Sequence, residues 1–145
     1  MEKPITIAIR KLHDDAIIPV YQTTGSSGRD LHSDDSFLLA PGEIRLVRTA
    51  IAIQLPEGYE GQIRSRSGLA SKGIIVLNSP GTIDSDYTGE VRVLLMNVGK
   101  EGYTVRRYDR IAQLVIAKVE RALIEFTSEI TQTERGANGF GSTGK

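Results

Sequence analysis

The stretch Glu90-Val91-Arg92-Val93-Leu94 decides the fold class, because its apolar side chains alternate with charged ones. A period of two is typical of a β-strand that buries one face. Ile5-Thr6-Ile7-Ala8-Ile9 alternates in the same way, whereas apolar residues at helical spacing are scarce. The sequence therefore predicts a protein built mainly from strands.

Outward from these two stretches, short apolar segments alternate with turn signals rich in Pro and Gly. Further strands are predicted over 43–55, 59–64, 74–77, 104–106, 110–119 and 123–126, with turns at 41–42, 56–58, 80–81 and 99–102. One short helix is predicted over 67–72, with Ser67 as its N-cap and Gly73 at its end. Short strands between frequent turns indicate an all-β sandwich or barrel.

Length and composition restrict the function classes. The 145 residues suit one domain, and equal numbers of basic and acidic residues, 18 each, disfavour broad nucleic-acid binding. The chain has no Cys and only two His, which excludes disulfides, thiolate catalysis and Cys-ligated zinc. Any metal is expected to be a hard cation bound by oxygen.

The first residues, Met1-Glu2-Lys3-Pro4, lack the pattern of an export signal. No apolar run approaches the roughly 18 residues of a membrane span. We therefore expect a cytoplasmic protein without a membrane partner.

The stretch 131–145 differs from the rest, since Phe140 is its only large apolar residue. We expect a β-domain over 1–130 and a flexible tail over 131–145. The pattern Gly139–Lys145 matches part of a phosphate-binding P-loop, but the strand before it and the helix after it are lacking. Two interpretations remain: a solvated tail, or a flap whose Arg135, Ser142 and Thr143 close over an anion.

The stretch 78–90 is predicted to be a β-hairpin with a cluster of carboxylates. Asp84 could deprotonate a water, Asp84 and Asp86 could bind a cation, or both could cap nearby N–H groups in a turn. Upstream, Arg64 and Arg66 lie beside the predicted helix, where they could bind an anion or be exposed to solvent.

Five segments, in this order along the chain, resemble the five motifs of the trimeric dUTP diphosphatases, or dUTPases. They are Ser27-Gly28-Arg29-Asp30-Leu31, Arg66-Ser67-Gly68-Leu69-Ala70, the stretch 78–90, Asp109-Arg110-Ile111-Ala112-Gln113-Leu114, and the stretch 135–144. The resemblance implies a jelly-roll-like β-clip barrel with one short helix. It also implies a homotrimer with shared active sites and a mobile C-terminal tail.

The resemblance also implies the chemistry. Asp84 would be the general base for a water that attacks the α-phosphorus of dUTP, releasing dUMP, the dTMP precursor, and pyrophosphate. Asp30 would orient a water of bound Mg²⁺. Tyr87 would pack under the deoxyribose and exclude a 2′-hydroxyl.

The remaining site residues implied by the resemblance bind parts of the substrate. The uracil would be read by Asn78 and by backbone around Gly81, Thr82, Ile83 and Arg92. The phosphate chain would be held by Arg66, Ser67, Gly68 and Gln113. From the tail, the γ-phosphate would be reached by Arg135, Ser142 and Thr143, and the base would be stacked by Phe140. The chain departs from the family pattern at Arg29, where an aromatic or small residue is frequent, and at Ser65, where Pro is usual. It also departs at Tyr108, where Gly is usual, and at Ala137-Asn138, where an acidic residue and Gly are usual.

Two other functions are open to the same fold. A dCTP deaminase has a similar hairpin, but its catalytic carboxylate would fall at Leu94, which cannot shuttle a proton. A non-catalytic trimeric binding module would have no evident use for Asp84, Arg66, Gln113 and a complete tail. The sequence therefore favours the dUTPase interpretation.

Overall fold

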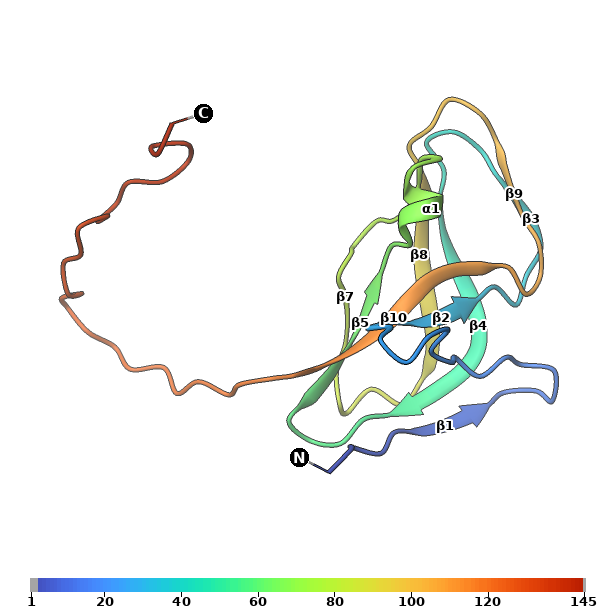
Figure 1. Ribbon diagram of the computed structural model, residues 1–145, viewed down its shortest axis with the longest axis horizontal. Helices are drawn as coiled ribbons and strands as arrows, with labels where there is room; N and C mark the ends of the chain where they lie inside the picture. Colours follow the sequence, from blue (N-terminus) through green and yellow to red (C-terminus); the bar gives the residue numbers. More distant parts are fainter. Residues whose placement is uncertain (1–2, 145) are drawn as a thin grey trace.

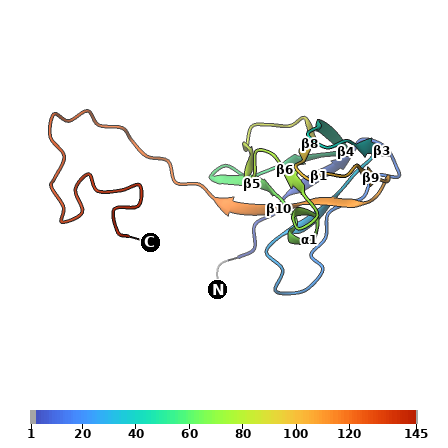
Figure 2. The ribbon, with the colours of Figure 1, turned by 90° about the horizontal axis from the view of Figure 1, so that it is seen from above.

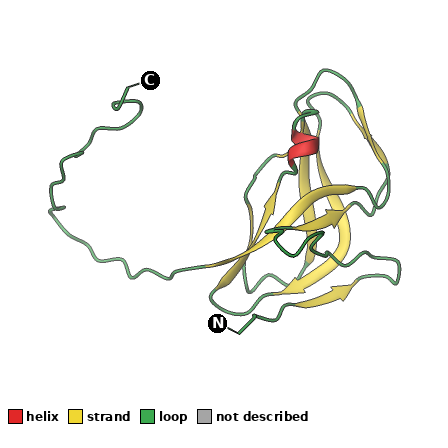
Figure 3. Cartoon of the chain, viewed as in Figure 1, coloured by secondary structure: helices red, strands yellow, loops and turns green. Residues whose placement is uncertain are grey.

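The computed structural model describes residues 3–144, so Met1, Glu2 and Lys145, with the ends of the predicted domain and tail, lie outside the described residues. The described chain forms ten strands and one short helix (Figures 1 and 3). The prediction of an all-β fold is confirmed.

The strands form two four-stranded antiparallel sheets and one two-stranded sheet. The first sheet has the order β1 (Ala8–Lys11), β4 (Ile44–Gln54), β8 (Glu90–Asn97) and β6 (Ile74–Val76). The second has the order β2 (Arg29–His32), β10 (Arg110–Lys118), β5 (Tyr59–Arg64) and β7 (Gly81–Ile83). The small sheet pairs β3 (Phe37–Leu39) with β9 (Tyr103–Val105).

The core lies between the two larger sheets, with β4 and β8 on one side and β5 and β10 on the other (Figure 2). Along β8 the alternation predicted from the sequence is observed: Val91, Val93 and Leu95 are buried. Ile63 and Leu114 of the second sheet belong to the same buried cluster. Burying each such side chain contributes about 1.5 to 3 kcal/mol, so this cluster holds the sheets together.

Strand β1 begins later than the predicted strand 5–9. Its pairing with β4 runs from Ala8 opposite Gln54 to Lys11 opposite Ile51. Because β4 ends at Gln54, residues 5–7 extend past the end of their partner. The prediction of a strand in this part of the chain is confirmed, but its predicted bounds are wrong, because the neighbouring strand sets its position.

The helix α1 (Ser67–Ala70) is shorter than predicted, and its N-cap is Arg66 rather than Ser67. The helix ends at Ala70, with Ser71 as its C-cap, so the prediction that Gly73 ends it is wrong. Gly73, with a φ of +85°, a left-handed conformation that suits Gly, instead ends the turn that leads into β6.

The predicted strand 123–126 does not form. After Lys118 the chain leaves the sheets, as Figure 1 shows, and Leu123 and Phe126 are almost fully exposed. A strand needs a partner for its backbone groups, and this part of the chain runs away from every sheet of the described residues. Strands β2 and β3 were not predicted, because they are too short to show an alternating pattern.

A charged cluster joins three connecting segments beside β2. Asp34 Oδ1 lies 2.8 Å from His13 Nε2 and 3.2 Å from Arg107 Nη2. Burial alone would raise the pKa of Asp34, but the hydrogen bonds from His13 and Arg107 outweigh it and lower the pKa below its usual value. The ionised carboxylate therefore stabilises the folded state.

The segment that carries Arg107 is also strained. Tyr108 has a φ of +74°, which explains why Gly is usual at this position in the family that the sequence resembles. Its N–H donates to Ser33 O at 2.7 Å, and Arg107 stacks over its ring at 4.7 Å. These contacts hold a non-glycine residue in a conformation that it rarely adopts.

Replacing Asp34 with Asn should lower the free energy of unfolding at pH 7 by about 1 to 3 kcal/mol, because a buried charged hydrogen-bond acceptor is lost. Since the folded pKa of Asp34 is lowered, this stabilisation is present above the ordinary value of 3.8 and disappears as the pH falls through the folded value. Urea unfolding of wild type and Asp34→Asn at pH 7 and at pH values below 3.8 measures the difference.

Asp35→Asn is the matched control, since it removes the same charge one residue further along. If wild type and Asp34→Asn differ in free energy of unfolding by the same amount at the lowest pH as at pH 7, the ionised Asp34 is not the source of the stabilisation.

Candidate functional site

The segment 78–90 is not a hairpin. Strand β7 pairs with β5, with Gly81 opposite Ile63 and Ile83 opposite Gly61. Strand β8 pairs with β4 and β6 in the other sheet. The segment between β7 and β8 therefore crosses from one sheet to the other, turning where Tyr87 N donates to Asp84 O at 3.1 Å.

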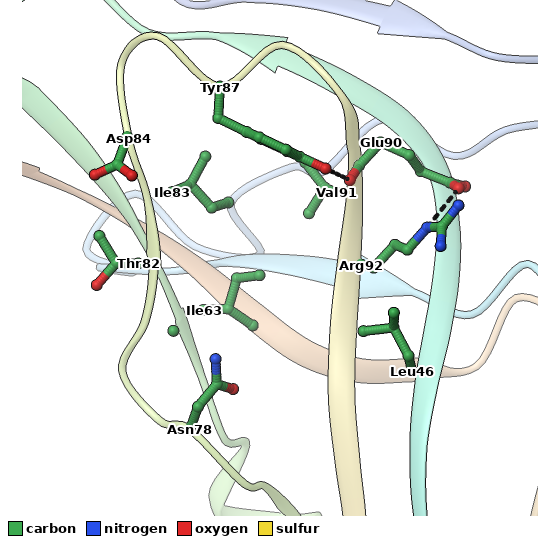
Figure 4. A pocket seen from close by; sticks show the side chains of 11 residues that line it. Leu46, Ile63, Asn78, Thr82, Ile83, Asp84, Tyr87, Glu90, Val91 and Arg92 are labelled. Atoms are coloured by element: carbon green, nitrogen blue, oxygen red, sulfur yellow. Dashed lines mark hydrogen bonds and ion pairs between the residues drawn. The ribbon is translucent and has the colours of Figure 1, made fainter.

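A hollow of about 390 Å³ lies between β7 and β8 (Figure 4). Seven residues that the sequence analysis singled out line it: Asn78, Gly81, Thr82, Ile83, Asp84, Tyr87 and Arg92. The crossing of the chain from β7 to β8 thus gathers the residues of this part of the chain that were predicted around the base and sugar, whereas Phe140, predicted to stack on the base, does not line the hollow. Ile63 and Leu46 add apolar walls from β5 and β4.

Tyr87 lies across the hollow, as Figure 4 shows. Its hydroxyl donates to the backbone oxygen of Glu90 at 2.8 Å. The ring also packs against Gly89, where an added Cβ would lie 2.7 Å from the Tyr87 hydroxyl oxygen. The aromatic ring therefore has a defined position although it is exposed on one side.

Asp84 is exposed, and its carboxyl group points to the side of β7 opposite the side chain of Ile83 (Figure 4). Neither Asp84 nor Asp86 makes a side-chain hydrogen bond within residues 3–144, so these carboxylates do not cap the turn. Residues 3–144 also contain no group of three or more His, Cys, Asp or Glu side chains arranged to hold a metal. The carboxylate of Asp84 is thus without a hydrogen-bond partner among the described residues.

Arginine side chains form a second cluster around Asp30, which is nearly buried. Asp30 Oδ1 lies 3.1 Å from Arg66 Nε, and Oδ2 lies 3.6 Å from Arg110 Nη1. Arg66 also donates to the backbone oxygen of Arg110 at 3.0 Å. One carboxylate therefore holds two guanidinium groups together at the start of α1.

A hollow beside this cluster is lined by Arg66, Arg110, Gly68 and Lys72, among others, and suits an anion. His32 lies two residues after Asp30 on β2. Its Nδ1 is buried and has no hydrogen-bond partner among the described residues. Burial lowers the pKa of His32. Arg64 does not join the cluster, because its guanidinium donates to Gln62 Oε1 at 2.5 and 3.0 Å.

Gln113 of β10 is held near the same end of the molecule. Its Nε2 donates to the backbone oxygen of Ser65 at 3.0 Å, and Ser65 Oγ accepts from Val76 N at 2.8 Å. Gly28 faces the other side of this carboxamide, where an added Cβ would lie 2.3 Å from Gln113 Oε1. Gly28 therefore leaves the space that Gln113 occupies.

The tail residues lie apart from both hollows. Arg135, Ser142 and Thr143 line a hollow of their own, and Phe140 is fully exposed. Within the single chain, the predicted site residues thus fall into three separate groups (Figure 1).

Sequence reasoning missed three residues that shape these groups: Gly28, Glu90 and Arg110. Each lies inside a segment that was quoted as a motif. Arg110 could have been found as a second guanidinium near an anion site, whereas the contacts of Gly28 and Glu90 join residues far apart in the chain.

The two-sheet fold, a nucleoside-sized hollow beside a free carboxylate, and paired arginines together define a nucleotide-hydrolysing enzyme. The sequence model of the dUTPase family matches residues 14–144, and the chain therefore belongs to the dUTPase family. The prediction that it is an enzyme of this class, a dUTP diphosphatase, is confirmed.

Curated relatives cover almost the whole chain. The deoxyuridine 5′-triphosphate nucleotidohydrolase of Nautilia profundicola is 54% identical over 96% of this chain and 99% of its own length. That of Neorickettsia sennetsu is 56% identical over 90% of this chain and 89% of its own length.

Solved structures agree with the fold. The dUTPase of Staphylococcus bacteriophage 80alpha with dUpNHpp superposes with a TM-score of 0.91 at 27% identity, covering 97% of this chain and 99% of that one. A mutant dUTPase of S. aureus phage phi11, described with a structural Mg(II) ion, has a TM-score of 0.80 at 25% identity, covering 86% and 98%. The predicted jelly-roll-like fold is confirmed. No helix within residues 3–144 has the length and apolar character needed to cross a membrane.

Replacing Gly28 with Ala should lower kcat/KM for dUTP about ten- to a hundredfold, because the new methyl group displaces the Gln113 carboxamide. The hydrolysis rate, measured as pyrophosphate release, checks this expectation. Gly25→Ala is the matched control, since a Cβ there meets no atom within 4 Å. Equal activity of the two variants would show that the position of Gln113 is unimportant.

Proposed function

We propose that this protein hydrolyses dUTP to dUMP and pyrophosphate, with Asp84 as general base and with Mg²⁺ bound to the nucleotide. The observation that carries the proposal is the hollow between β7 and β8, which places a tyrosine and an amide side chain around one space, with the carboxylate of Asp84 on the outer side of β7 at its edge (Figure 4). The names of the relatives support the same substrate.

The hollow suits a deoxyuridine. Asn78 and the unpaired edge of β7, the last strand of its sheet, would supply donors and acceptors for the edges of a pyrimidine. Tyr87, fixed by its hydrogen bond to Glu90 O, would lie against the sugar and leave no room for a 2′-hydroxyl. Selectivity for dUTP over UTP and dTTP would then arise from steric exclusion.

Asp84 would accept a proton from the water that attacks the α-phosphorus. Its carboxylate is exposed and makes no hydrogen bond within residues 3–144, so it is available to a water molecule. General-base catalysis requires the base within hydrogen-bond reach of that water, and the substrate must therefore extend from the hollow toward Asp84.

The phosphate chain would bind to Arg66, Ser67, Gly68 and Gln113, near the paired guanidinium groups. A cation held mainly by phosphate oxygens needs few protein ligands. The carboxylate of Asp30 suits a Mg²⁺-bound water because its oxygens can accept hydrogen bonds from that water. When bound with the nucleotide, Mg²⁺ would supply positive charge that neutralises the phosphate oxygens.

We also propose the homotrimer with shared sites. Apolar side chains after β10 are exposed in the single chain, and large exposed apolar groups mark contact surfaces; they are Leu123, Ile124, Phe126 and Ile130. The separation of the three site groups within one chain supports assembly of each site from several copies. The tail boundary at 131 and the cytoplasmic location stay predictions.

The experiment that tests the function is pyrophosphate release from dUTP, UTP, dTTP and dCTP in the presence of Mg²⁺, with ammonia measured alongside. Only dUTP should be hydrolysed. Asp84→Asn should lower kcat about a hundred- to ten-thousandfold, because it removes the basic lone pair, while binding of a non-hydrolysable dUTP analogue is kept.

Asp86→Asn is the matched control and should keep most of the activity, since Asp86 lies two residues further along the same turn. Near-native turnover of Asp84→Asn would refute the assignment of the base, and ammonia release from dCTP would favour a deaminase.

Deleting residues 131–145 should leave the β-domain folded and abolish most turnover, because this segment supplies Arg135, Phe140, Ser142 and Thr143. Phe140→Ala alone should cost about ten- to a hundredfold in kcat/KM if its ring stacks on the base. Phe140→Trp should keep activity, and its fluorescence should be quenched by a dUTP analogue. A truncated protein as fast as the full chain would mean that the tail is only a solvated extension.

A further inference from the structure

Glu90, the first residue of β8, contacts several separate segments of the chain, although the chemistry proposed above gives its side chain no role. Its side chain is only 8% exposed although it lies at the rim of the hollow. We propose that Glu90 is a positioning residue, whose buried carboxylate fixes the strand end that holds Tyr87 and thereby sets the discrimination between deoxyribose and ribose. This inference rests on the proposed function.

The carboxylate is bound on both oxygens. Oε1 accepts from Arg48 Nε at 3.3 Å and from Arg92 Nε at 3.1 Å, as Figure 4 shows for Arg92. Oε2 accepts from the backbone N–H of Ala50 at 2.9 Å. A buried carboxylate with two cationic partners and one backbone donor is strongly held in one position.

The Ala50 contact explains why a carboxylate is needed here. The register between β4 and β8 shifts between Arg48 and Ala52, so β4 contains a bulge opposite Glu90. Ala50 lies in this bulge with a φ of +58° and is fully buried. Its N–H bonds to the Glu90 side chain in place of a backbone oxygen of β8, so the side chain ties the end of β8 to β4.

The same residue holds Tyr87 through its backbone. The Tyr87 hydroxyl donates to Glu90 O at 2.8 Å, and the ring packs on Gly89, the residue before. Thr49 Oγ1 donates to Val91 O on the other side, so the backbone around Glu90 is bonded from two directions. If the hydrogen bond from Ala50 N–H to the Glu90 carboxylate is lost, the Glu90 carbonyl oxygen that accepts from the Tyr87 hydroxyl is free to shift.

A shift of the Tyr87 ring would matter most to a substrate that the ring excludes. Accommodating one hydroxyl group requires a displacement of about 1 Å or more, and misplacements of this size change rates by up to about a hundredfold. The carboxylate of Glu90 is therefore expected to act on selectivity and KM rather than on the proton transfer at Asp84.

The test compares wild type with Glu90→Gln, which keeps the shape of the side chain but turns one acceptor into a donor. The ratio of kcat/KM for dUTP to that for UTP should fall about tenfold, mostly through a lower KM for UTP, while kcat for dUTP stays near that of the wild type. Tyr87→Phe should reduce the ratio in the same direction. The double variant should lose little more than either single variant, because both act on the position of one ring.

Glu43→Gln is the matched control. Glu43 also accepts from a backbone N–H, that of Ala40 at 2.9 Å, and from an arginine, Arg45 Nε at 3.2 Å, but it does not line the hollow. Glu43→Gln should therefore leave the ratio of kcat/KM for dUTP to that for UTP unchanged. The melting temperature of both variants shows whether a general loss of stability accounts for the result.

A ratio for Glu90→Gln within twofold of wild type, or equal losses for dUTP and UTP, would overturn the inference. Absence of dUTP hydrolysis by the wild type would instead refute the proposed function. In that case a crystal structure of Glu90→Gln decides: a displaced Tyr87 ring supports the positioning role, and an unmoved ring with its bond to Glu90 O intact overturns it.

Discussion

The packing of the two sheets through a single apolar core is the constraint on which the site depends. Val91 and Val93 of β8 face Ile63 of β5 within one buried cluster, and this holds two sheets at a fixed separation. Because β7 is paired to one sheet and β8 to the other, the six residues between them must span that separation. The hollow is the space left beneath this crossing segment, so its width follows from the core.

Charge is organised locally although the chain carries no net charge. Asp30 holds Arg66 and Arg110 together, and Glu90 does the same for Arg48 and Arg92. In each case a mostly buried carboxylate offsets part of the repulsion between two guanidinium groups. An anion site built in this way can present positive charge to a triphosphate while the protein as a whole stays neutral.

Several elements could be predicted because their signal is local. The strand 59–64 was predicted with its observed bounds, and the glycines of the turns at Gly42 and Gly58 have the positive φ that such turns require. The candidate residues around the hollow were also found from one continuous stretch. What failed was pairing: the hairpin over 78–90 and the strand over 123–126 both depend on which neighbour a segment meets.

The sequence by itself determined the all-β class and the family, and it predicted the residues that we propose to carry the chemistry, because alternation, turn residues and motifs are read along the chain. Only the tertiary structure decided that β7 and β8 lie in different sheets, that Gln113 fills the space beside Gly28, and that Glu90 reaches Ala50. The physical reason is that these contacts join segments far apart in the chain, or depend on a bulge with a positive φ at an alanine. No local preference of the chain records such contacts, since they form only when the sheets pack.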